Sequence, residues 1–191
     1  NTFFTINYQL SRSRNANTAS ALMPTEAQRA GAVSAEALAL LSYYPLPNFT
    51  GNSRYNYQVP LVSITNQNNV NARLSHTINS KNQISGNFAW QSSDGNNPNV
   101  FGFVDTTAMT GYNTGLTYTY HFTTRLISNL RYNFSRQVTD LTPYFANRQN
   151  VSGLAGIAGN DQAAEFWGPP TLNFSSGIAT LSDGNAARNH N

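Results

Sequence analysis

Histidine and carboxylate side chains are the residues of this chain that can hold a metal ion or transfer a proton. The three histidines, His76, His121 and His190, lack His-x-x-x-His spacing and neighbouring acidic ligands, so they form no zinc motif. The eight Asp and Glu residues are spread thinly over 191 positions, and no pair stands out as a general acid and base. Cysteine is absent, which excludes thiolate metal sites and thiol catalysis. We expect neither enzymatic activity nor a resident cofactor or metal ion.

One segment has the spacing of a calcium-binding loop but not its chemistry. Asp94, Asn96 and the twelfth-place Asp105 match ligand positions, whereas Pro98 occupies another ligand position and Asn99 stands where the sharp turn needs Gly. We interpret this stretch as an Asn-rich surface loop.

Three aromatic residues are candidates for contact with a ligand. Tyr43 and Tyr44 follow a short aliphatic run, and Trp167 opens the rigid sequence Trp-Gly-Pro-Pro. In outer loops, such side chains could stack on a sugar or an aromatic ligand. The alternative, which we favour, is that they pack the loops against themselves.

The composition excludes several classes of protein. Charged residues make up 10% of the chain, against about a quarter in ordinary globular proteins, whereas Asn alone contributes 27 residues and aromatics 12%. Coiled coils and helical bundles need dense Glu and Lys, and disordered chains are poor in aromatics. The 11 basic and 8 acidic residues give a net charge of +3, but the basic residues are scattered. We therefore expect no nucleic-acid partner.

The dominant pattern is an alternation with a period of two residues, which is typical of strands with one apolar face. Even-numbered positions carry the apolar side in every stretch. The pattern predicts five long strands, at about residues 2–12, 69–78, 83–92, 110–122 and 125–138.

The predicted connections are alternately long and short. The short ones are the turn Asn79–Asn82 and the pair Thr123–Thr124. Pro24–Glu26 and Ser34–Ala37 each predict the start of a short helix inside the first long connection. The longest aliphatic run is only Ala37–Leu41, far short of a membrane-spanning helix. The long connections cover about residues 13–67, 93–109 and 139–191.

Alternating short turns and long loops are typical of outer-membrane barrels. The apolar side is rich in Tyr, Phe and Trp, and the chain contains a single Lys, the residue with which soluble sheets protect their edges. About ten residues per strand, tilted by about 40°, rise about 25 Å, which matches the apolar band of such barrels. We predict an all-β fold, an antiparallel up-and-down meander of about five long strands. It would be a piece of a transmembrane outer-membrane β-barrel, with short helices in long extracellular loops. A soluble β-sandwich or solenoid remains the alternative.

Strand parity assigns side chains to the two faces of the predicted barrel. The residues predicted to face lipid are Phe88, Trp90, Leu116, Tyr118, Tyr120, Leu130 and Tyr132. Those predicted to face the lumen are Asn71, Arg73, Asn87, Thr117, Asn129 and Arg131.

Several segments, taken in order, resemble TonB-dependent outer-membrane receptors. The resemblance is greatest to the Oar-like branch, whose members often carry an N-terminal carboxypeptidase-regulatory-like domain, and it spans nearly all of the chain. The segments that carry it are Phe3–Gln9, Pro24–Gly31, Tyr44–Asn48, Asn71–His76, Leu130–Arg136 and Trp167–Pro170.

The resemblance implies a 22-strand barrel in the outer membrane of a Gram-negative bacterium, plugged by an N-terminal domain. It also implies import of a scarce nutrient, a siderophore, oligosaccharide or peptide, driven by the TonB complex through a TonB box. Neither plug nor TonB box is expected within residues 1–191, so the chain is expected to be an internal barrel piece. The expected partners are outer-membrane lipid, the TonB complex through missing N-terminal regions, and an imported small ligand. A secreted or cell-surface β-rich adhesion protein is the main alternative, and a passive porin-like or autotransporter barrel is a third.

Overall fold

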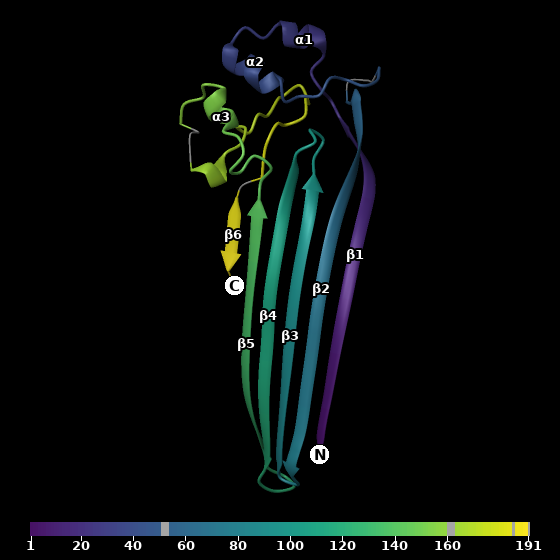
Figure 1. The fold of residues 1–191 in the computed structure, drawn as a ribbon, viewed down its shortest axis with the longest axis vertical. Helices are drawn as coiled ribbons and strands as arrows, with labels where there is room; N and C mark the ends of the chain where they lie inside the picture. The colour runs from purple at the N-terminus through teal and green to yellow at the C-terminus, as the bar shows by residue number, and fades with distance from the viewer. Residues whose placement is uncertain (51–53, 160–162, 185, 191) are drawn as a thin grey trace.

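The computed structural model describes residues 1–50, 54–159, 163–184 and 186–190. It contains one antiparallel sheet whose six strands are ordered as in the sequence (Figure 1). The strands are β1 (Thr2–Ala21), β2 (Tyr57–Asn79), β3 (Asn82–Pro98), β4 (Val104–His121), β5 (Ile127–Thr142) and β6 (Ala187–His190). The helical segments are α1 (Glu26–Ala30), α2 (Ala35–Leu41), α3 (Val151–Leu154) and the 3₁₀ turn η1 (Ala164–Phe166). No helix of the described residues is long and apolar enough to cross a membrane.

The connections segregate to the two ends of the sheet. Both short turns, β2–β3 and β4–β5, lie at the end that also holds the N-terminus, and all helical segments lie at the other end (Figure 1). The predicted meander is therefore confirmed. We call the described parts of residues 22–56, 99–103 and 143–186 the loop cap.

Side chains of the turn residues stabilise both short connections. The Asn79 Oδ1 atom accepts hydrogen bonds from the Lys81 backbone N–H (2.9 Å) and from Asn82 Nδ2 (2.8 Å). At the second turn, Thr123 Oγ1 accepts from the backbone N–H groups of Arg125 (3.2 Å) and Leu126 (3.0 Å). Asn and Thr are favoured in turns because their side chains can replace a backbone acceptor in this way.

The strands are longer than the alternation predicts. β1 continues to Ala21 and β2 already begins at Tyr57, so the first connection is shorter than the predicted 13–67. The long loop predicted at 93–109 is wrong, because β3 and β4 pair up to Pro98 and Val104 and leave only residues 99–103 between them. The short strand β6 within the predicted loop 139–191 was also not foreseen. In β1 and β3 the pairing continues where both faces carry polar or small side chains, so the alternation vanishes although the backbone hydrogen bonds continue. The early part of β2 carries apolar side chains on both faces, so it shows no alternation either.

The register keeps one parity on each face of the whole sheet. Ile84 pairs with Tyr118 and Tyr118 with Leu130, so even-numbered residues stand opposite even-numbered residues across successive strands. The single exception is the Asn79–Asn82 pair, which follows a register shift at the β2–β3 turn. The predicted shared parity is confirmed. We call the two surfaces the even face and the odd face.

The buried core lies in the loop cap and not against the sheet. On the even face Phe4 is 75% exposed and Leu130 is 71% exposed. The cap helices begin as predicted: Thr25 forms a capping box with Gln28, and the Ser34 side chain accepts from the Ala37 N–H. The core of the cap consists of Met23, Leu40, Tyr44, Phe103, Phe145, Val151, Ala155 and Leu181.

Candidate functional site

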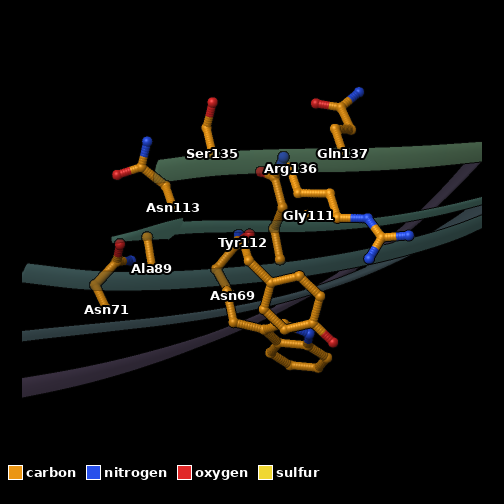
Figure 2. A pocket seen from close by; sticks show the side chains of 11 residues that line it. Asn69, Asn71, Ala89, Gly111, Tyr112, Asn113, Ser135, Arg136 and Gln137 are labelled. Atoms are coloured by element: carbon orange, nitrogen blue, oxygen red, sulfur yellow. The ribbon is translucent and has the colours of Figure 1, made fainter. Parts of the chain in front are cut away.

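The odd face is a continuous polar surface built from short amide and hydroxyl side chains. Cross-strand pairing places Asn71 beside Ala89, Asn113 and Ser135 in one row across β2 to β5. Figure 2 shows these four side chains on one side of the sheet and the Tyr112 ring on the other. The side chains predicted to line the lumen all fall on this face by register, namely Asn71, Arg73, Asn87, Thr117, Asn129 and Arg131.

Two glycines of β4 leave room for neighbouring amide side chains at the centre of the odd face. Gly111 and Gly115 are both buried, and a Cβ atom at Gly115 would lie 2.5 Å from Asn87 Oδ1 and 2.9 Å from Asn133 Oδ1. The amides of β3 and β5 therefore approach each other over a strand that carries no side chain there. Two odd-numbered glycines in a strand are a signal that sequence inspection could have used.

Three open hollows lie along the odd face. One of about 310 Å³ lies at Gly111, Gln91 and Gln137 (Figure 2). A second of about 330 Å³ adjoins it at Asn7 and Asn71. The third, of about 570 Å³, lies nearer the short turns and is lined by Arg73, Asn87, Thr117, Arg131 and Asn133.

The charges on the odd face are few and mostly positive. Within the strands they are the guanidinium groups of Arg73 and Arg131 and, beside the loop cap, the carboxylate of Asp105. Amides and hydroxyls both donate and accept hydrogen bonds. Chemically, this surface can hold water or a polar solute.

The even face carries the residues predicted to meet lipid, and its central part is apolar. Phe88, Trp90, Leu116, Tyr118, Tyr120, Leu130 and Tyr132 all share this face. Aromatic side chains mark both limits of the apolar part. Tyr8, Trp90 and Tyr112 lie in one row, and near the short turns the rings of Tyr120 and Phe122 meet edge to face at 4.5 Å.

Tyr43 and Tyr44, two of the candidate ligand contacts, pack inside the loop cap. Tyr44 is 3% exposed and its hydroxyl donates to the Ala179 carbonyl oxygen (2.9 Å). Tyr43 is half-buried, packs edge to face on Phe145 at 5.7 Å, and accepts a hydrogen bond from Gln149 Nε2. These contacts agree with the alternative in which the aromatics pack the loops. Trp167 is half-buried directly after η1.

Arg29 connects α1 to the end of α2 through hydrogen bonds, and the sequence did not predict this role. The Arg29 guanidinium donates to the carbonyl oxygens of Pro24 (3.1 Å), Leu41 (3.1 Å), Tyr44 (2.9 Å) and Pro45 (2.6 Å). A single Arg among distant carbonyls leaves no pattern in the sequence, so no local signal could have identified it.

Comparison with known families distinguishes a membrane barrel from a soluble β-sheet protein. The family described as Outer membrane beta barrel domain matches residues 32–191. The chain belongs to this family. No curated protein and no solved structure matches it.

Membership of the outer-membrane β-barrel family removes the soluble sandwich as an interpretation. A sandwich needs a second sheet over the apolar face, whereas the described residues of this barrel domain form one sheet with large apolar side chains exposed. Exposed apolar side chains on a single sheet are expected of a membrane barrel, because the outer side of its strands faces lipid.

Proposed function

We propose that this domain is part of a TonB-dependent outer-membrane receptor of a Gram-negative bacterium that imports a scarce nutrient. In this proposal the even face meets lipid, the odd face lines the lumen, and the loop cap faces outward. The TonB complex would act through regions N-terminal to this domain, and the ligand would be a small polar solute.

The dimensions of the even face support its contact with lipid. On β4 the aromatic limits Tyr112 and Tyr120 are eight positions apart, which is about 27 Å along a strand and about 21 Å along the membrane normal at a tilt of about 40°. This span is close to the height of the apolar band of outer-membrane barrels, about 25 Å.

The observation that carries the proposal is the hollow, polar odd face. Small barrels fill their interior with side chains, whereas wide barrels leave a lumen that holds water or a plug. Here glycine, Asn, Ser and Thr leave hollows of about 310 to 570 Å³ on the interior side. This surface favours a wide, plugged transporter over a small filled barrel. The folded loop cap at the outer end supports the same function, since long outer loops carry binding sites.

Conductance separates this proposal from a passive porin. The full-length protein in a planar lipid bilayer should be electrically silent, because a plug fills the lumen. Deletion of the plug should produce a large, steady conductance. A full-length protein that conducts at once would support a porin, and no conductance in either form would support an adhesion protein.

The dependence of nutrient uptake on TonB tests the proposed import. Cells that express the protein should lose uptake of its nutrient when TonB is deleted, and equally when the receptor gene is deleted. Uptake that persists without TonB would contradict the proposal.

A further inference from the structure

The even face changes its chemistry toward the loop cap. Tyr8, Trp90 and Tyr112 share a row with Arg136. Two rows nearer the cap, the register aligns side chains that are mostly charged or polar. This upper row consists of Arg12, Asn66, Asp94, Ala108, Asp140 and Arg188.

The positive charge of this region is only partly neutralised. Asp140 pairs with Arg188, with Oδ1 and Nε 3.1 Å apart, and Asp94 accepts a hydrogen bond from Asn66 Nδ2 (2.7 Å). Arg12 and Arg136 are exposed, and no ion pair joins either to a carboxylate among the described residues. Arg12 reaches only the backbone carbonyl oxygens of Ser11 and Gln67.

Arg136 lies where an apolar surface gives way to a polar one. It stands directly opposite Tyr112 across the β4–β5 pair, and Figure 2 shows its guanidinium on the same side of the sheet as the Tyr112 ring. Aromatic side chains of membrane proteins lie at the headgroup level. Long cationic side chains extend from the apolar region toward that level.

We propose that Arg136 and Arg12 bind phosphate groups of lipid headgroups in the outer leaflet. The inference rests on the part of the proposed function in which the even face meets lipid. Arg forms bidentate hydrogen bonds with phosphate oxygens, and its positive charge complements anionic lipid. Because Arg136 is on β5 and Arg12 is on β1, two rows nearer the loop cap, they form two separate contacts.

A local probe of lipid composition tests the contact at Arg136. Thr110 is on the even face, between the row of Arg136 and the row of Asp140. The full-length protein carrying a bimane fluorophore on T110C is placed in phosphatidylcholine vesicles with either brominated phosphatidic acid or brominated phosphatidylcholine. The relative quenching gives the local preference for the lipid with the exposed phosphate.

The fluorophore should be quenched more by brominated phosphatidic acid than by brominated phosphatidylcholine. R136Q should lower this preference about fivefold, because one basic residue near a charged membrane surface changes the affinity by about that factor. R131Q is the matched control, because Arg131 is on the same strand but on the odd face, and it should leave the preference unchanged. A bimane on L10C should report the effect of R12Q in the same way.

The outcomes separate the phosphate contact from the lipid contact on which it rests. Quenching by brominated phosphatidylcholine with no preference for phosphatidic acid, or equal losses in R136Q and R131Q, would overturn the phosphate site alone. Absence of quenching by either lipid would overturn the lipid-facing assignment. Inorganic phosphate at constant ionic strength should not displace the lipid, and displacement would identify a site for free phosphate instead.

Discussion

Asp105 and Asp183 hold two consecutive backbone amides of the segment after β5. The Tyr144 N–H donates to Asp105 Oδ1 (2.9 Å) and the Phe145 N–H donates to Asp183 Oδ2 (3.4 Å). Burial, the neighbouring charge of Asp105 and a hydrogen bond with the Asp105 side chain together raise the pKa of Asp183 to about 6. Together the two carboxyl groups attach the loop cap to the start of β4.

The stability of this attachment should therefore depend on pH. A carboxyl group whose pKa is higher in the folded than in the unfolded state stabilises the fold fully below the unfolded value, about 4. That stability is lost as the pH rises through about 6. Hydrogen-exchange protection of the Tyr144 and Phe145 amides should thus be higher at about pH 4.5 than at about pH 7.5, after correction for the intrinsic exchange rate.

Substitution of Asp183 by Asn should remove this dependence. The amide is neutral at every pH and keeps an oxygen that can accept from Phe145 N–H, so protection should become nearly constant. D140N is the control, because Asp140 is partly exposed beside Arg188 on the even face, whereas Asp105 is on the odd face. Protection that increases with pH in the unmodified protein would contradict the assignment.

Arg29 should be the residue on which the helical part of the loop cap depends most. R29A removes donors to four backbone carbonyl oxygens and should destabilise the cap by about 2–3 kcal/mol. R29K should restore only part of this loss, because an ammonium group lacks the planar array of donors. Limited proteolysis of the full-length protein measures the effect, with K81A at the opposite end as a control that should not change the rate.

The two ends of the sheet should lie on opposite sides of the outer membrane. Val33 is 98% exposed in the loop cap and Ser80 is exposed in the β2–β3 turn. Since residues 1–191 contain no cysteine, V33C and S80C introduce single thiols into this domain. A membrane-impermeant maleimide added to intact cells should label V33C and should reach S80C only after permeabilisation. The reverse result would invert the orientation.

Adjacent residues of β4 should respond oppositely to the same charge. Leu116 lies on the even face in the row of Phe4 and Leu74, and Thr117 lies on the odd face. L116R should cost about 2–4 kcal/mol in the folded barrel because the charge would face hydrocarbon near the midplane. T117R should be tolerated, since water can solvate its charge. Unfolding of the full-length protein from vesicles measures both, and equal losses would contradict the assignment of the two faces.

A lipid-borne quencher checks the assignment of the faces without adding charge. Nitroxide labels near the middle of the acyl chain should quench a fluorophore at Leu116 or Tyr118 of the full-length protein. They should quench one at Thr117 or Asn87 far less. Absence of contact at the two even positions would exclude the membrane-facing arrangement.

The sequence by itself determined the features that depend on neighbouring residues. A strand places successive side chains on opposite faces, so the alternation around Leu116 and Thr117 was sufficient to identify both faces and their shared parity. Asn79 in its turn and Thr25 and Ser34 at their helix starts act on backbone groups two or three positions away. Such contacts are visible in a short window of sequence.

Only the tertiary structure decided the features that join distant segments. β3 extends to Pro98 and β1 to Ala21 because their backbones find partners across the sheet, although both faces are polar there and carry no periodic signal. Tyr44 became a core residue because the chain brings Phe101 and Ala179 against it. The Asp105–Asp183 pair likewise joins the start of β4 to a distant segment of the loop cap. These contacts depend on how segments pack in three dimensions, and residue spacing along the chain does not encode that packing.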